Sequence, residues 1–303
     1  MRSTSLMNGD RDSVRRSRQL RMRRGMYVLP SVFTALNIAA GYFAITQSLQ
    51  GSVADPTHFD YAAIAIGIAI PFDAIDGRIA RMTNTASDFG KELDSLADVI
   101  TFGVAPSILA YSWGFRMLPE MARAESRHQL LQVGAIACFL FLICGACRLA
   151  RFNISKNPVP RNPGRPDRKY FVGMPIPAGA GVLAACVHYF NGTPITVWWF
   201  SIAWVALVLL VGFLMVSTWR FWSAKEINFS RAHPFQLLFV LAIVVYVMVR
   251  YSNVVFFGIG VTYMFSGIWA RAAYSWSRRR RRGAIAVAVP DAHSVEAESA
   301  KLS

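Results

Sequence analysis

Five aspartates lie close together in a chain that is otherwise strongly apolar. Residues 73 to 98 read DAIDGRIARMTNTASDFGKELDSLAD, and the apolar stretch YAAIAIGIAIPF stands directly before them. A carboxylate beside a membrane-length apolar segment is costly, so such a group usually faces a bundle interior or a water-filled cavity and serves a function. We therefore interpret four of the five as a functional site and Asp88 as a solvated turn residue; the four are Asp73, Asp76, Asp94 and Asp98.

The spacing of these residues places them on helix faces. Asp73 and Asp76 are three residues apart, while Gly90, Asp94 and Asp98 follow one another at intervals of four and form one stripe. If the two segments form a helical hairpin with the polar residues between them as its turn, the two stripes can face each other. Converging carboxylates repel one another unless cations lie between them, and hard oxygen ligands suit Mg²⁺, Mn²⁺ or Ca²⁺.

Small residues and one cation stand near the same place. Gly77, Ala80 and Gly90 lack bulk, which leaves room for a ligand or for close helix contact. Arg81 adds a positive charge that could bind a phosphate group. The plainer alternative is a polar loop between two spans that happens to be acidic.

The complete pattern resembles the signature of the CDP-alcohol phosphotransferase family. It reads Asp-x-x-Asp-Gly-x-x-Ala-Arg-x8-Gly-x3-Asp-x3-Asp, and all eight defining positions are present. These are integral membrane enzymes that join an alcohol to a phosphoryl-bearing group, with one substrate CDP-activated, and release CMP. The resemblance implies that the four aspartates bind a pair of divalent cations, Mg²⁺ or Mn²⁺. It further implies that Asp94 and Asp98 are catalytic, with Asp98 as the general base.

A second segment is similar to the entry motif of the same family. LPSVFTALN, which ends at Asn37, carries Thr34 and Asn37 about one helical turn apart, so both point to one side. The resemblance implies that they border the cytidine together with the small residues named above, while Arg81 contacts phosphate. Ser31 stands where asparagine is usual in the motif. The alternative role for the two polar side chains is hydrogen bonding between helices.

Two later stretches narrow the resemblance to one branch of the family. RLARFN (148–153) and the downstream PIPAGAG resemble the CDP-diacylglycerol–serine O-phosphatidyltransferases, over about residues 26–230. This implies CDP-diacylglycerol and L-serine as substrates. A carboxylate such as that of serine is bound best by two parallel hydrogen bonds from one group, which an arginine guanidinium supplies. The candidates are Arg148, Arg151 and Asn153, with Arg220 and Lys225 further along the chain. Their alternative role is to mark cytoplasmic helix ends by charge.

Composition predicts an all-α integral membrane protein. Of 303 residues 54% are hydrophobic, and the mean hydropathy is +0.36. We expect about eight transmembrane helices, a six-helix catalytic core followed by two additional C-terminal helices. The expected spans are near 26–47, 59–81, 91–113, 130–152, from Tyr170, 195–217, 234–249 and 254–274. The expected regions are a basic arm (1–25), the core (26–232), the two added helices (233–275) and a polybasic disordered tail (276–303).

The basic residues indicate orientation. The net charge is +15, and anionic lipid headgroups are the expected partner in the bilayer rather than nucleic acid. Positive charge concentrates in segments that the positive-inside rule assigns to the cytoplasm. These are 1–25, 82–90, 153–169, 218–232 and 275–303. We therefore predict a multi-pass protein of the cell (inner) membrane with a cytoplasmic active site, and the resemblance implies a homodimer.

Other functions remain to be tested. The aspartate signature alone also allows a sister enzyme that uses glycerol 3-phosphate or inositol as acceptor. A transporter would be expected to carry acids through the membrane midplane or to show internal repeats, neither of which the sequence has. Cys144 and Cys147 have metal or redox spacing, but no second Cys/His pair accompanies them, so we expect them to pack as small apolar side chains.

Overall fold

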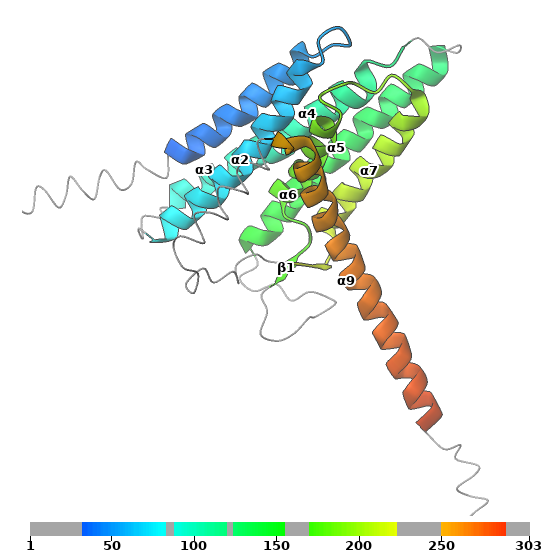
Figure 1. The fold of residues 1–303 in the computed structure, drawn as a ribbon. Helices are drawn as coiled ribbons and strands as arrows, with labels where there is room; N and C mark the ends of the chain where they lie inside the picture. The colour runs from blue at the N-terminus through cyan, green and yellow to red at the C-terminus, as the bar shows by residue number, and fades with distance from the viewer. Residues whose placement is uncertain (1–31, 83–87, 120–123, 155–169, 223–249, 289–303) are drawn as a thin grey trace, which may run out of the picture.

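The predicted all-α membrane architecture is confirmed. The computed structural model describes residues 32–82, 88–119, 124–154, 170–222 and 250–288 (Figure 1). Six of its helical segments are long and apolar enough to cross a membrane, and α6 is apolar but shorter. The predicted span 234–249 lies outside the described residues. The described helices are Val32–Gln50, α2 (Thr57–Met82), α3 (Asp88–Val99), η1 (Ile100–Val104), α4 (Ala105–Tyr111), η2 (Ser112–Arg116), α5 (Ala124–Ile154), α6 (Ile176–Tyr189), α7 (Trp198–Val216) and α9 (Ser252–Ala288).

The segment from α3 to η2 is one helical run that contains two π-helical stretches. Its first π stretch, η1, begins two residues after Asp98, and its buried Thr101 donates a hydrogen bond to the backbone oxygen of Asn37 (2.8 Å). A Cβ atom on Gly41 would lie only 2.6 Å from the Thr101 hydroxyl oxygen. The first helix therefore packs closely against η1 because a glycine stands at the crossing.

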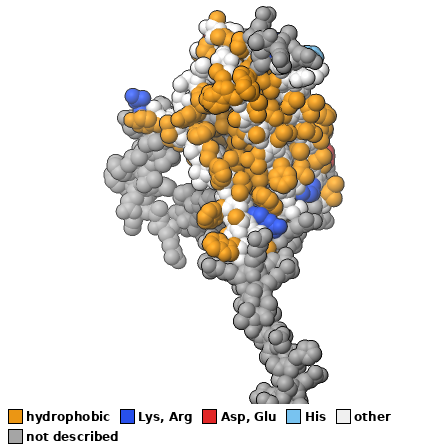
Figure 2. All heavy atoms as spheres, turned by 90° about the vertical axis from the view of Figure 1, so that its right-hand side faces the viewer, with side chains coloured by type: hydrophobic (Ala, Val, Ile, Leu, Met, Phe, Trp, Pro, Cys, Tyr) orange, Lys and Arg blue, Asp and Glu red, His pale blue; other side chains and the backbone are white. Residues whose placement is uncertain are grey.

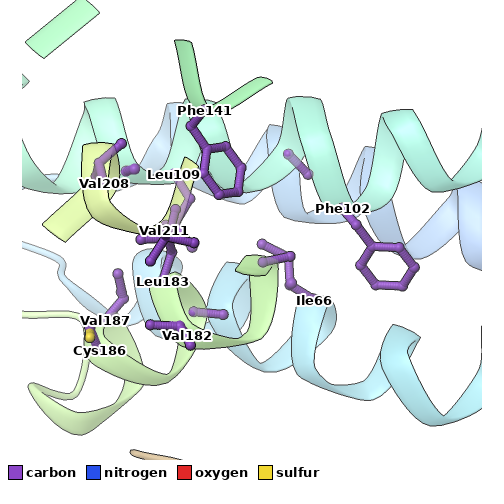
Figure 3. Close-up of a cluster of buried hydrophobic side chains, with 14 of the residues drawn as sticks. Ile66, Phe102, Leu109, Phe141, Val182, Leu183, Cys186, Val187, Val208 and Val211 are labelled. Carbon is purple, nitrogen blue, oxygen red and sulfur yellow. The ribbon is translucent and has the colours of Figure 1, made fainter. Parts of the chain in front are cut away.

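The core lies where α2, α4, α5, α6 and α7 meet. Figure 3 shows Leu109, Phe141 and Leu183 pointing toward one another from three of these helices, and all three are fully or nearly buried. Many apolar side chains instead face outward, among them Phe139 (59% exposed) and Trp269 (77% exposed). Figure 2 shows one face covered mostly by apolar side chains. An apolar exterior of this extent is typical of a surface that faces lipid.

The helices define two ends of the bundle. One end, which we call the site end because the predicted aspartates lie there, contains the last turns of α2, α5 and α7 and the start of α3. The opposite end holds the first turns of α2, α5 and α9 and the last turn of α6. At the opposite end, Nδ1 of His188 is hydrogen-bonded to the Asp60 carboxylate (2.6 Å), and Nε2 is hydrogen-bonded to the Ser252 hydroxyl (2.9 Å). These bonds join α2, α6 and α9, which are far apart in the sequence.

A two-stranded ribbon at the site end was not predicted. Strand β1 (Tyr170–Val172) pairs antiparallel with β2 (Arg220–Trp222). Hence α6 begins at Ile176 rather than at the predicted start of the fifth span, Tyr170. Gly173, at the junction, has φ +76°, and a Cβ atom there would lie 2.6 Å from the Met215 carbonyl oxygen. Both the dihedral angle and the close approach require glycine.

The final helix is longer than the sequence predicted. The predicted span 254–274 is confirmed within α9, but the helix continues to Ala288, and Figure 1 shows its C-terminal part projecting from the bundle. The prediction of a disordered segment starting at 276 is therefore wrong for residues 276–288. Arginine has high helix propensity, and extending an existing helix requires no new nucleation.

Candidate active site

Three of the predicted aspartates converge at the site end of the bundle. Asp73 on α2 and Asp94 and Asp98 on α3 each offer one carboxylate oxygen, and these oxygens all lie within 4.8 Å of one another. All three side chains are half-buried. The structure thus brings Asp73 of the first predicted pair to Asp94 and Asp98 of the second. The side chain of Asp76 lies outside the described residues.

Local sequence explains how α2 and α3 present these groups. Asp94 and Asp98 are four residues apart on α3, so they lie one above the other on one helix face, and Ala97 beside them is fully buried. The π-helical stretch η1 follows Asp98 almost at once, and such stretches are frequent at functional sites. The predicted small residues Gly77 and Gly90 are half-buried within the same two helices.

The geometry fits a divalent cation. Oxygen ligands of Mg²⁺ or Ca²⁺ lie about 2.0–2.6 Å from the ion, so two ligands of one ion are up to about 5 Å apart. The three carboxylate oxygens meet this limit. Oδ1 of Asp98 is also buried and has no hydrogen-bond partner among the described residues. A buried carboxylate oxygen without a partner is costly, and a bound cation would satisfy it.

A buried amide lies on the first helix, which packs against η1, the continuation of α3. Asn37 is 2% exposed, and both polar atoms of its side chain lack a hydrogen-bond partner among the described residues. Its backbone oxygen accepts a hydrogen bond from Thr101, which stands three residues after Asp98 on the same helical run. Thr34, one turn earlier, is buried as well. Because buried polar groups are nearly always paired, the Asn37 amide is a candidate ligand-binding group.

A buried arginine supplies positive charge next to the carboxylates. Arg148 on α5 is 5% exposed, its guanidinium lies 5.1 Å from the Phe152 ring centroid, and it interacts electrostatically with Asp98. Its Nε has no hydrogen-bond partner among the described residues. A buried guanidinium that is incompletely paired can bind an anionic ligand group.

Arg151 differs, because its terminal nitrogens already have protein partners. They donate to the backbone oxygens of Val216 (2.8 Å), Ser217 (3.2 Å) and Val172 (3.3 Å), with a longer contact to Met215 (3.4 Å). The last carbonyls of a helix have no partner within the helix and carry partial negative charge. Arg151 therefore joins the end of α7 to β1.

Arg151→Ala is expected to act mainly on stability. Charged hydrogen bonds contribute about 1.5–3 kcal/mol each, and the truncation leaves several carbonyls unpaired. We expect a melting temperature lower by about 5 °C or more, with KM for both substrates changed to the same extent. A thermal melt and two KM values check this. A selective rise in the KM for serine with an unchanged melting temperature would instead support the predicted role in serine binding.

The remaining predicted residues are placed as follows. Asn153 at the end of α5 donates to Ser95 Oγ (2.9 Å), next to Asp94. Arg220 is half-buried in β2. The side chains of Ala80, Arg81 and Lys225 lie outside the described residues.

Comparison with known proteins gives consistent matches. A family model described as CDP-alcohol phosphatidyltransferase matches residues 27–203. The chain is 34% identical over 244 residues to a CDP-diacylglycerol–serine O-phosphatidyltransferase of Helicobacter pylori, covering 78% of this chain and 90% of the relative. It is 36% identical over 194 residues to the protein of the same name in Methanocaldococcus jannaschii (64% and 73% covered). It is also 33% identical over 192 residues to an archaetidylserine synthase of Methanothermobacter thermautotrophicus (63% and 67% covered).

Proposed function

The chain belongs to the CDP-alcohol phosphatidyltransferase family, and we propose that it transfers the phosphatidyl group of CDP-diacylglycerol to the hydroxyl of L-serine, giving phosphatidylserine and CMP. One observation carries this proposal. The three converging carboxylates occur in a chain whose bacterial and archaeal relatives are named for transfer to serine. It is therefore an enzyme whose substrates are a membrane lipid and a free amino acid.

The aspartates would hold a divalent metal at the place where the diphosphate reacts. Asp73, Asp94 and Asp98, with Asp76 as a fourth ligand, would hold Mg²⁺ or Mn²⁺, two ions by the family resemblance. When bound, the ions supply positive charge to the diphosphate oxygens and stabilise CMP as the leaving group. This is the electrostatic and positioning logic of phosphoryl transfer in general.

Asp98 is the proposed general base. It accepts the proton of the serine hydroxyl as that oxygen forms a bond to the phosphorus that carries diacylglycerol. The bond from this phosphorus to the bridging oxygen breaks, and CMP leaves with that oxygen and its electron pair. Asp98 could act both as ligand and as base because a carboxylate has two oxygens, so one oxygen could bind the cation while the other accepts the proton.

Neutral groups would bind the nucleotide. Thr34 and Asn37 would border the cytidine, and the orphaned Asn37 amide offers both a donor and an acceptor to a base or a ribose. Gly77, Ala80 and Gly90 would leave room for it, and Arg81 would contact phosphate.

Charged groups would bind the acceptor. Arg148 is the main candidate for the serine carboxylate because it is buried next to Asp98 and incompletely paired. Asn153, Arg220 and Lys225 remain further candidates. Arg151 contributes chiefly by holding the end of α7 against β1.

The proposal includes location and assembly. The basic segments lie in the chain next to the elements of the site end, which supports a cytoplasmic site in the inner membrane. Serine and the CDP headgroup would then reach the site from the cytoplasm. We further propose a homodimer, as in the family, with no nucleic-acid partner.

The test is an acceptor panel with purified protein. CDP-diacylglycerol, Mn²⁺ or Mg²⁺, and in turn serine, glycerol 3-phosphate or inositol are incubated with the protein, and CMP and the lipid product are quantified. We expect CMP in equimolar amount with phosphatidylserine, and at least about a hundredfold preference for serine, in line with a site built to pair with a specific polar group. Turnover of glycerol 3-phosphate or inositol in preference to serine would establish the sister activity instead.

A further inference from the structure

A groove on the side of the bundle, which we call the lateral groove, lies between three helical segments. Its volume is about 400 Å³, and its walls come from Leu49 at the end of the first helix, from α4 and η2, and from Ala135 and Phe139 of α5. Leu49 and Phe139 are exposed, so the groove opens on the outside of the bundle. Its volume is within the usual range for ligand sites in proteins.

The lateral groove lies in the half of the membrane opposite to the aspartates. Its wall on the helical run of α4 and η2 extends from Ser107 to Arg116, nine residues or about 14 Å. This is roughly half the thickness of the hydrocarbon core of a bilayer, so the groove spans one leaflet. Asp98 stands eighteen residues before Arg116 on the same run, about 27 Å away. A lipid with its headgroup at Arg116 therefore lies outside the active site.

Arg116 places a positive charge at the outer end of the lateral groove. One of its terminal nitrogens donates to the backbone oxygens of Gly51 (2.8 Å) and Leu49 (3.1 Å), which holds the side chain against the end of the first helix. Its Nε is buried and has no hydrogen-bond partner, and no carboxylate forms an ion pair with it, among the described residues. An anionic oxygen would pair with this donor and balance the charge.

The rest of the lateral groove is mostly apolar. Ile108, Phe139 and Leu142 contribute hydrocarbon surface, and the Ser107 hydroxyl already donates to the backbone oxygen of Gly103 (2.8 Å). The groove thus combines apolar walls one leaflet deep with a single cation at the membrane boundary. A molecule that matches both features has an acyl chain and an anionic headgroup.

We propose that the lateral groove binds one anionic phospholipid of the leaflet opposite to the active site, with an acyl chain between α4 and α5 and a phosphate oxygen on Arg116. The bound lipid contacts the first helix, η2 and α5 together, so it stabilises the packing of the helix that carries Thr34 and Asn37. Binding here is independent of the reaction at the aspartates. The alternative is that interchangeable lipid tails fill the groove and that Arg116 only caps the first helix.

Native mass spectrometry of the purified full-length protein, titrated with phosphatidylglycerol, measures this affinity. We expect one tightly bound lipid per chain. Phosphatidylcholine, whose net charge is zero, should bind about fivefold more weakly, which is the attraction of one basic residue to a negative headgroup. Diacylglycerol with the same acyl chains lacks the phosphate and should bind about tenfold more weakly or less. Equal affinity for phosphatidylglycerol and diacylglycerol would overturn the proposal.

Arg116→Gln tests the headgroup contact. It should weaken phosphatidylglycerol binding by about tenfold or more, because a charged hydrogen bond is lost, and leave diacylglycerol binding unchanged. Arg250→Gln is the matched control, since it removes the same charge from an exposed arginine that stands two residues before α9 at the same end of the bundle. The same loss in both variants would show a general effect of surface charge and would reject a specific site at Arg116.

Ala135→Phe tests the groove without altering the contacts of Arg116 with the first helix. The larger side chain should fill the groove and abolish tight binding, together with the rise in melting temperature that phosphatidylglycerol gives the unmodified protein. Ile136→Phe, at the next exposed position of α5 and outside the groove, should retain both. Undiminished binding by Ala135→Phe, or equal losses in the two α5 variants, would contradict a lipid site in the lateral groove.

Discussion

Asp98→Asn and Asp94→Asn are each expected to reduce kcat for CMP release by about a thousandfold or more, while the protein still inserts into the membrane. Removing one preorganised electrostatic group that acts on the transition state costs about 10²–10³ in kcat, and each of these carboxylates is also a proposed metal ligand. Asparagine keeps the shape and one oxygen but loses the charge. CMP release from CDP-diacylglycerol by purified variants measures the effect.

Glu92→Gln is the matched control for these variants. Glu92 is exposed on α3, two residues before Asp94, and is not part of the carboxylate cluster. The same change of charge should therefore leave kcat within about twofold, since surface charge changes usually have small effects. Near-normal turnover by either aspartate variant would rule out a metal-centred mechanism at this site.

Arg148→Ala is expected to raise the KM for serine by about 10- to 100-fold, because a charged hydrogen bond contributes about 1.5–3 kcal/mol. Arg148→Lys should restore the KM for serine only in part, since lysine has the positive charge but not the planar guanidinium that makes two parallel hydrogen bonds. The KM for CDP-diacylglycerol should change little. KM values for both substrates measure the selectivity.

An acceptor without a carboxylate provides the control for Arg148. Ethanolamine has the hydroxyl and the amine of serine but no carboxylate, so any turnover with this acceptor should be the same with or without Arg148. A parallel loss with serine and ethanolamine would mean that the arginine supports the site as a whole and does not recognise the carboxylate.

The sequence was sufficient to predict the aspartate hairpin because its signals are local. Spacings of three and four residues define helix faces, and carboxylates next to apolar spans indicate a site. Asp73, Asp94 and Asp98 meet as those two arguments require. The membrane class likewise follows from composition, which needs no knowledge of tertiary contacts.

The features that sequence reasoning missed depend on contacts between distant segments. Arg151 has the residue type of an anion-binding group, but its neighbours include carbonyls some 65 residues away at the end of α7. The β1–β2 ribbon pairs segments of three residues, too short to show a strand pattern. The close approach of Gly267 to the Phe221 ring likewise joins α9 to β2, two segments that are far apart in the sequence.

The central claim is that the three convergent carboxylates hold a divalent cation, and the most direct measurement is Mn²⁺ binding by electron paramagnetic resonance on purified protein. The unmodified chain and Glu92→Gln should bind Mn²⁺ tightly enough to remove the free-ion signal at stoichiometric concentration, whereas Asp98→Asn should leave most of the ion free. Equal binding by Asp98→Asn and the unmodified chain, or no binding by the unmodified chain, would contradict it.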